Sequence, residues 1–232
     1  MEKTKLITIC PEDILKLALF IRIFHDYKGY SQDLGKENHS NAGLFLLLEK
    51  IPDEFIDDEI EFRNFSDIKE LREILLERSH LDKAIILDLR NQLISNNITL
   101  KKDPKKALEN FHYFHSFKEL KSHYFIESIG TKRETALCIH LATNVPIILM
   151  SQTIINTTGT GAIYFFIKRG LYLKLYLQHL STVPYSYYIN PEESLVLISE
   201  TYSFDKKERT IKRINKEIVN WKNLNKEFLE LF

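Results

Sequence analysis

The run Leu171-Tyr-Leu-Lys-Leu-Tyr-Leu-Gln-His179 has leucine at every odd position through Leu177. Side chains of a β-strand alternate between its two faces, so this period of two predicts a strand with one apolar and one amphipathic face. Further strand-like runs, separated by turns that contain glycine or proline, extend the pattern to an antiparallel meander over residues 145–204. These runs span residues 147–156, 162–168, 185–189 and 194–203.

Upstream of the meander the apolar spacing becomes that of helices. Asp103-Pro104 combines a helix N-cap residue with proline at the first helical position, and it opens a pattern that lasts to about residue 128. Thr131 and Glu134 have the spacing of a capping box and predict a second helix to about residue 144. A short connection between these helices predicts an antiparallel helical hairpin. Helical spacing recurs over 11–27, 41–50 and 66–78, whereas the apolar run 84–89 fits either a strand or a helix.

The last part of the chain returns to helical spacing. Its apolar positions lie three or four residues apart, and they are Ile211, Ile214, Ile218, Trp221, Phe228 and Phe232, with Asn225 as the one polar member. Such a seam fits either packing against the protein's own sheet or a homodimer formed through the C-terminal helix.

These patterns together predict an α+β fold. It has a helical N-terminal half (about 1–144), an antiparallel β meander in the C-terminal half (about 145–204) and a closing C-terminal helix (about 206–232). No linker rich in proline, glycine or serine divides the chain, so we expect residues 1–232 to form a single compact domain.

Composition narrows the class of protein. The 232 residues include 32 Lys and Arg against 32 Asp and Glu, so a nucleic acid or an anionic membrane must be met through a local patch. The two cysteines cannot form a disulfide framework, the N-terminus lacks the apolar core of a signal peptide, and no apolar stretch approaches the ~20 residues of a membrane span. We therefore expect a cytoplasmic protein with no membrane partner.

The predicted helix over 104–128 carries a stripe of metal-ligand side chains. His112, His115, Glu119 and His123 fall within an arc of about 80° on this helix. Folding of the hairpin would bring His140 from the second helix to the height of Glu119. Because imidazole and carboxylate groups are common ligands of divalent metal ions, His115, Glu119, His123 and His140 form a candidate metal site. The alternative interpretation is a solvated polar face on a helix with an aromatic core.

Arg133 and His140 lie seven residues apart on one side of the second predicted helix. This segment resembles the R-x4-6-H motif of HEPN ribonucleases, a resemblance that covers eight residues. It implies that the arginine and histidine, usually across a dimer, promote RNA cleavage without metal. The segment departs from the family at Glu134, where a polar residue is common, and a β meander follows where an all-α bundle is expected. The alternative is an arginine in a capping turn and a half-buried structural histidine.

We therefore expect an intracellular hydrolase that acts on a phosphodiester or nucleotide, with Arg133, His140 and Glu119 as catalytic residues. In a metal-dependent version, His115, Glu119 and His140 hold an ion that activates water, and Arg133 stabilises developing phosphate charge. In a metal-free version, His140 is the general acid–base. The alternative is a non-enzymatic interaction or regulatory protein that binds its partner through the C-terminal helix or a sheet edge.

Two charge clusters complete the sequence. The first is acidic and suits either a hard cation or a solvated loop; it contains Asp53, Glu54, Asp57, Asp58, Glu59 and Glu61. The second is basic and suits either phosphate contacts or an exposed helix face; it contains Lys206, Lys207, Arg209, Lys212, Arg213 and Lys216.

Overall fold

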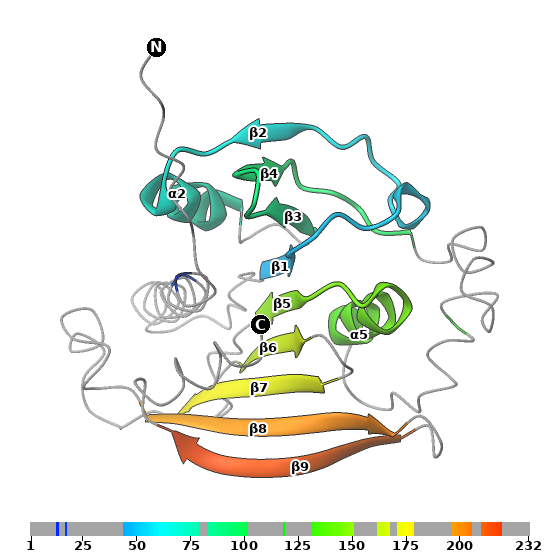
Figure 1. Cartoon of the computed structure of the whole chain (residues 1–232), viewed down its shortest axis with the longest axis vertical. Coiled ribbons are helices and arrows are strands. Elements are labelled where there is room, and N and C mark those ends of the chain that lie inside the picture. The colour runs from blue at the N-terminus through cyan, green and yellow to red at the C-terminus, as the bar shows by residue number, and fades with distance from the viewer. Residues whose placement is uncertain are drawn as a thin grey trace, which may run out of the picture.

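A mixed nine-stranded β-sheet forms the centre of the molecule (Figure 1). The computed structural model describes residues 13, 17, 44–78, 83–101, 118, 131–150, 162–167, 171–178, 196–205 and 210–219. The strands are β1 (Leu44–Leu47), β2 (Phe62–Asn64), β3 (Ile85–Asp88), β4 (Leu93–Ser95), β5 (Ile147–Met150), β6 (Ala162–Ile167), β7 (Leu171–Gln178), β8 (Val196–Asp205) and β9 (Thr210–Val219). The helices are the short 3-10 helix η1 (Asp53–Phe55) and the α-helices α2 (Ile68–Arg78) and α5 (Thr131–Thr143).

The strands follow the order β2-β4-β3-β1-β5-β6-β7-β8-β9, so β2 and β9 are the sheet edges among the described residues. β1 and β3 are parallel, and the chain between them includes α2. Every other pair of neighbouring strands in the described sheet is antiparallel. From β5 to β9 each strand pairs with the next one along the chain.

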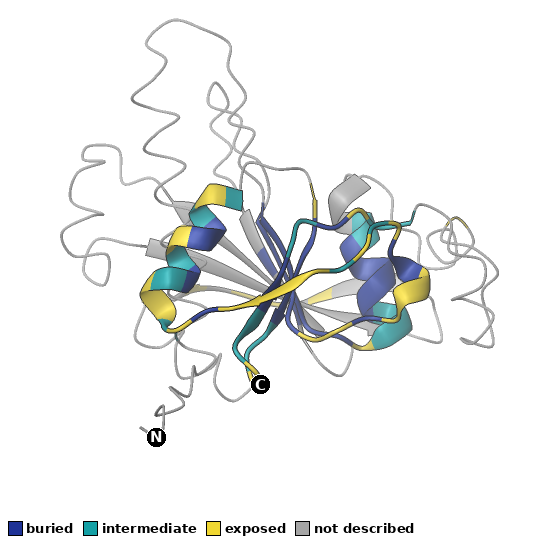
Figure 2. Cartoon of the chain, turned by 90° about the horizontal axis from the view of Figure 1, so that it is seen from above, coloured by how far each residue is buried: buried dark blue, intermediate teal, exposed yellow. Residues whose placement is uncertain are grey.

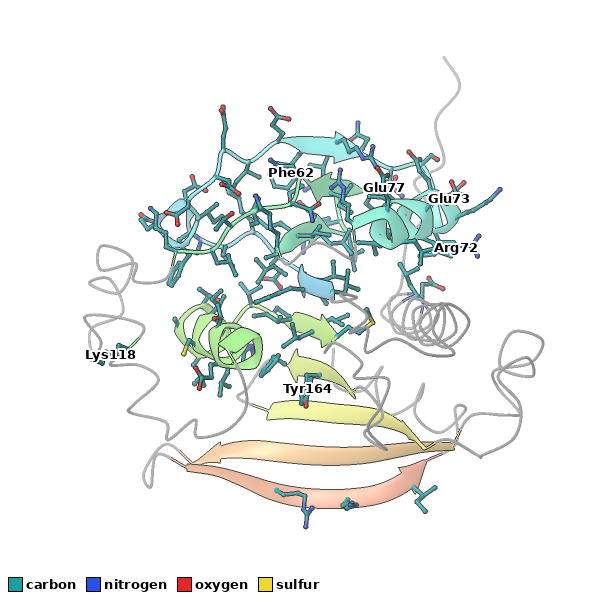
Figure 3. The ribbon with its side chains drawn as sticks, turned by 180° about the vertical axis from the view of Figure 1, so that it is seen from behind. Phe62, Arg72, Glu73, Glu77, Lys118 and Tyr164 are labelled. Atoms are coloured by element: carbon teal, nitrogen blue, oxygen red, sulfur yellow. The ribbon has the colours of Figure 1, made fainter. Side chains whose placement is uncertain are left out.

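The two α-helices cover opposite faces of the central strands, as Figure 2 shows from above. On one face, Leu71, Ile74 and Leu75 of α2 are buried, while Arg72 and Glu73 project away from the sheet (Figure 3). None of the helices in the described part is both long and apolar enough to cross a membrane.

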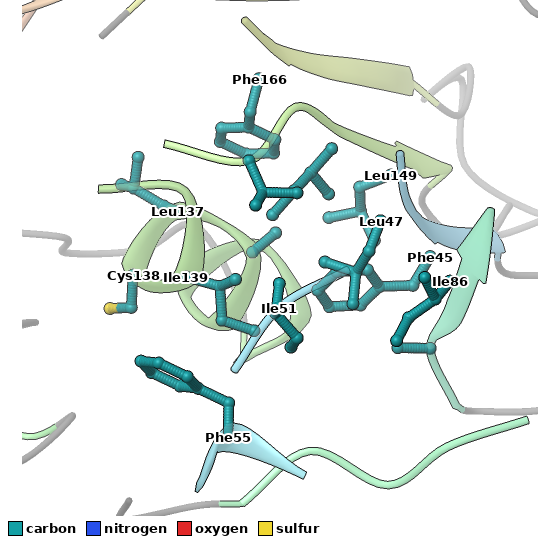
Figure 4. Close-up of a cluster of buried hydrophobic side chains, with 14 of the residues drawn as sticks. Phe45, Leu47, Ile51, Phe55, Ile86, Leu137, Cys138, Ile139, Leu149 and Phe166 are labelled. Atoms are coloured by element: carbon teal, nitrogen blue, oxygen red, sulfur yellow. The ribbon is translucent and has the colours of Figure 1, made fainter. Parts of the chain in front are cut away.

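On the other face, α5 shares one buried cluster with alternate residues of β1, β5 and β6 and with one residue of β3. Phe45 and Leu47 of β1, Ile86 of β3 and Leu149 of β5 lie in one buried cluster with Leu137 of α5 (Figure 4). Residues two apart on a strand lie on the same side of the sheet, so the cluster members of each strand identify which side faces α5. The cluster thus defines the α5 face of the sheet.

The start of α2 is fixed by short hydrogen bonds. The Asp67 carboxylate accepts the backbone N–H of Glu70 at 2.8 Å, as an N-cap residue does. The Glu70 carboxylate accepts both the backbone N–H and the hydroxyl of Ser66 at 2.7 Å. These bonds, led by the Ser66 hydroxyl, hold the pKa of Glu70 below its usual value. At the other end of α2, Arg78 donates to the backbone carbonyl of Ser95 on β4.

The predicted fold class is wrong in its N-terminal half. The described residues between 44 and 101 form β1 to β4 with the α-helix α2 and the short η1, rather than a helical block. The apolar spacing over 41–50 predicts a helix, but residues 44–47 form β1, because a short continuous apolar run fits a buried strand equally well. Between 102 and 130 the structure describes Lys118 alone, helical and exposed, so the helical hairpin lies outside the described residues.

The prediction of a closing C-terminal helix is also wrong for the part of it that the structure describes, because residues 210–219 form the edge strand β9. Ile211, Ile214 and Ile218 have helical spacing, but β-branched isoleucine also favours strands, and pairing with β8 decides the outcome. The predicted seam therefore does not form through these three residues. Trp221, Asn225, Phe228 and Phe232 lie outside the described residues, and a homodimer stays a prediction.

Replacing Asp67 by Ala should lower the free energy of unfolding by about 1 kcal/mol, because the N-cap bond to Glu70 is lost. Urea denaturation measures this change. The control is Glu73→Ala on the exposed side of the same helix, which should stay within about 0.5 kcal/mol of wild type. Equal effects of the two substitutions would contradict the capping role.

Candidate functional site

His140 lies near the C-terminal end of α5 and is almost completely buried, with 1% of its surface exposed. Its Nδ1 atom lies 2.9 Å from the carbonyl oxygen of Val145. A carbonyl oxygen only accepts hydrogen bonds, so this geometry assigns a proton to Nδ1. The imidazole ring also lies 5.9 Å, centroid to centroid, from the ring of Phe166 on β6.

The chain around His140 ends the helix and turns directly into β5. Asn144 adopts a left-handed φ of 59°, and its N–H donates to the His140 carbonyl at 2.7 Å. The Thr143 hydroxyl donates to the Ile139 carbonyl at 2.7 Å and accepts the Val145 N–H at 3.2 Å. The His140 side chain therefore ties the last turn of α5 to the first residues that lead into β5.

The remaining predicted site residues are placed only in part. Arg133 lies in the first turn of α5, on the same helix as His140. His115, Glu119 and His123 lie outside the described residues. The described residues contain no group of three His, Cys, Asp or Glu side chains that could hold a metal ion. The metal site and the approach of Glu119 to His140 thus stay predictions.

The acidic segment is held in place by hydrogen bonds and ion pairs. Asp58 accepts the backbone N–H of Thr99 at 2.6 Å and pairs with the Lys83 ammonium at 3.1 Å. The hydrogen bonds from Thr99, followed by the contact with Lys83, hold the pKa of Asp58 below its usual value. Asp53 pairs with Lys50 at 3.3 Å. Both carboxylates thus pair with lysine side chains, and Asp58 also attaches the segment to the chain at Thr99.

A separate set of cations lies at the β9 edge of the sheet. The strand register gives three cross-strand rows on one face of β7, β8 and β9. The rows are Tyr172, Tyr202 and Arg213; Lys174, Glu200 and Lys216; and Tyr176, Ile198 and Ile218. We call this surface the three-row face. At its β9 end Arg213, Lys216 and Ile218 are all exposed, Ile218 by 72%.

A β-bulge brings the two cations of β9 to the same face. Arg213 and Lys216 are three residues apart, and in a regular strand they would lie on opposite faces. The register shifts between Thr201 and Tyr202 of β8: Thr201 pairs with Asn215 and Tyr202 with Arg213, so the pairing passes over Ile214. The extra residue shifts the alternation of side chains along β9 by one position. Arg213, which is opposite Tyr202, therefore lies on the same side of the sheet as Lys216, which is opposite Glu200.

The three-row face continues inward onto the α5 face of the sheet. Tyr172 pairs with Phe166 of β6, and Lys174 pairs with Tyr164. Tyr164 and Phe166 are only 5% and 3% exposed, and both belong to the cluster that contains α5. The same side of the sheet is thus buried at β6 and exposed at β9.

The sequence analysis predicted these basic residues on an exposed helix, whereas Lys212, Arg213 and Lys216 lie on strand β9, with Lys212 on the opposite face from the other two. The alternation that would reveal a strand is interrupted by the bulge at Ile214, so the pattern over 210–219 mimics helical spacing. Lys206, Lys207 and Arg209 lie outside the described residues.

Comparison with known proteins adds no relative: neither a protein-family model, nor a curated protein, nor a solved structure matches the chain.

Replacing His140 by Ala should lower the free energy of unfolding by about 2–4 kcal/mol, because it removes the bond to Val145 and leaves a cavity. Chemical denaturation measures the loss. Glu54→Ala, at an exposed position of η1, is the control and should be close to wild type. A His140→Ala protein as stable as wild type would contradict the structural role.

Replacing Asp58 by Asn should lower the melting temperature at pH 7, since the pair with Lys83 loses its charge. The folded pKa of Asp58 lies below its unfolded value, so its contribution is present above about pH 4 and is lost as the pH falls through the folded pKa. The difference between wild type and variant should therefore shrink on acidification. Asp57→Asn, one residue earlier and exposed, is the control; a difference independent of pH would count against the charge interaction.

Proposed function

We propose that this chain is a non-enzymatic binding protein that holds a phosphate-bearing polyanion against the three-row face at the β9 edge of its sheet. The observation that carries the proposal is the pair of exposed cations, Arg213 and Lys216, on one face of the edge strand. This is the sheet-edge form of the interaction protein expected as an alternative from the sequence.

Charge on the three-row face supports a polyanion. The rows contain three cations, Lys174, Arg213 and Lys216, against one carboxylate, Glu200. The whole chain is neutral, with 32 basic and 32 acidic residues, so this excess is local. A local cationic patch binds a polyanion partly through the release of the counterions condensed on it, which makes the affinity depend on salt.

Protection of the sheet edge against pairing with another chain is the competing explanation for Arg213 and Lys216. Bulges and charged side chains on edge strands prevent pairing with other chains. That role is served by a cation on either face, whereas binding of one polyanion requires cations on the same face. Lys212, opposite Ser203, lies on the other face of β9 and provides the matched comparison.

The affinity for inorganic polyphosphate should fall in Arg213→Gln and in Lys216→Gln and stay at the wild-type value in Lys212→Gln. Each lost contact should also flatten the dependence of log K on log salt concentration, because fewer counterions are released. Titration at several salt concentrations measures both quantities. Three variants with the same affinity and slope as wild type would contradict the proposal.

The phosphodiester hydrolase expected from Arg133, His140 and Glu119 stays a prediction, and an activity assay separates it from a binding protein. Because His140 is buried and a substrate would not reach its imidazole, we expect a labelled oligonucleotide to remain intact in the presence of the protein, with or without added Mg²⁺ or Zn²⁺. Turnover that disappears in Arg133→Ala, with the melting temperature unchanged, would instead favour the hydrolase.

A further inference from the structure

We infer that the bound polyanion is a single-stranded nucleic acid whose bases stack on the tyrosines of the three-row face. The inference rests on the proposed function and names its ligand. It depends on an observation independent of the cations: Tyr172, Tyr176 and Tyr202 share one face with Arg213 and Lys216.

The register sets aromatic and cationic residues in alternate rows. Tyr172 and Tyr202 are directly paired neighbours, and Tyr176 lies two rows further along β7. Lys174 and Lys216 belong to the row between them. Consecutive rows on one face are about 6.7 Å apart, and neighbouring strands are about 4.8 Å apart. Aromatic and cationic residues are therefore interleaved at short distances.

This interleaving matches the two chemical features of a single strand. Aromatic rings provide stacking platforms for bases, and a cationic groove follows the phosphates. In a duplex the bases are already stacked and enclosed, so only the phosphates are available to the protein. Tyrosines on the face thus add nothing to the binding of a duplex or of polyphosphate, whereas they increase the affinity for a single strand.

Burial at β6 limits the extent of the site. Tyr164 and Phe166 continue two of the three rows, but they are buried in the cluster beneath α5. The site therefore covers β7 to β9 and accommodates a short segment of the strand. Since stacking tolerates every base, we expect little sequence preference.

The inference is tested by fluorescence anisotropy with four ligands. They are labelled oligothymidylate and oligouridylate of about 20 nucleotides, a duplex of equal length, and polyphosphate. Tyr202→Leu should weaken binding of both single strands about tenfold or more, and Tyr202→Phe, which retains the ring, should bind as wild type does. Polyphosphate affinity should be the same in all three proteins. Comparison of the two single strands shows whether the ligand is DNA, RNA or either.

The fold of each variant is checked by its melting temperature, and Tyr176→Leu with Tyr176→Phe replaces the pair if Tyr202→Leu unfolds. Equal affinity for single strand, duplex and polyphosphate, or equal binding by the Leu and Phe variants, would overturn the inference while a dependence on Arg213 and Lys216 would still support the proposed function. Absence of binding to every polyanion at low salt would overturn both. Binding of polyglutamate in preference to nucleic acid would assign the face to an acidic protein partner and would also overturn the inference.

Discussion

Antiparallel pairing of β1 with β5 joins the two halves of the sheet, β2-β4-β3-β1 and β5-β6-β7-β8-β9, into one continuous sheet. Leu44 to Leu47 pair residue by residue with Ile147 to Met150, and all eight residues are buried. With α2 on one face and α5 on the other, each of these strands has two apolar faces, which explains the continuous sequences LFLL and IILM. A polar substitution in either strand would enter a core that has no water-facing side.

Burial decreases outward from this seam, from the strands covered by the two helices to the exposed residues of β9. Phe45, Leu149 and Phe166 pack under α5, whereas Arg213 and Lys216, on the same side of the sheet, are exposed. Side chains that meet a helix must be apolar, while those beyond it are released from that constraint. Arg213 and Lys216 of β9 occur where this constraint ends, and exposed cations of this kind are suited to contact with a negatively charged ligand.

Local signals in the sequence identified several elements because they require no knowledge of the partner strands. The capping-box spacing of Thr131 and Glu134 predicts a helix that the structure has as α5, and the alternating leucines predict β7. By contrast, residues 44–47 and 210–219 are ambiguous by themselves, and their strand conformation depends on pairing with β5 and β8. The depth of His140 could not be predicted either, since it depends on α5 packing against a sheet that includes β1 and β3. The metal ligands proposed at His115, Glu119 and His123 lie outside the described residues.

The bulge at Ile214 connects the incorrect sequence interpretation with the proposed function. A spacing of three between Arg213 and Lys216 favours one side of a helix and disfavours one side of a strand. In the structure a single unpaired residue compensates for the odd spacing, so the two cations reach the same face of a strand. The bulge also interrupts the regular edge and hinders pairing with another chain. One residue thus serves two requirements: it protects an edge of ten residues, and it concentrates positive charge on one face of a protein whose net charge is zero.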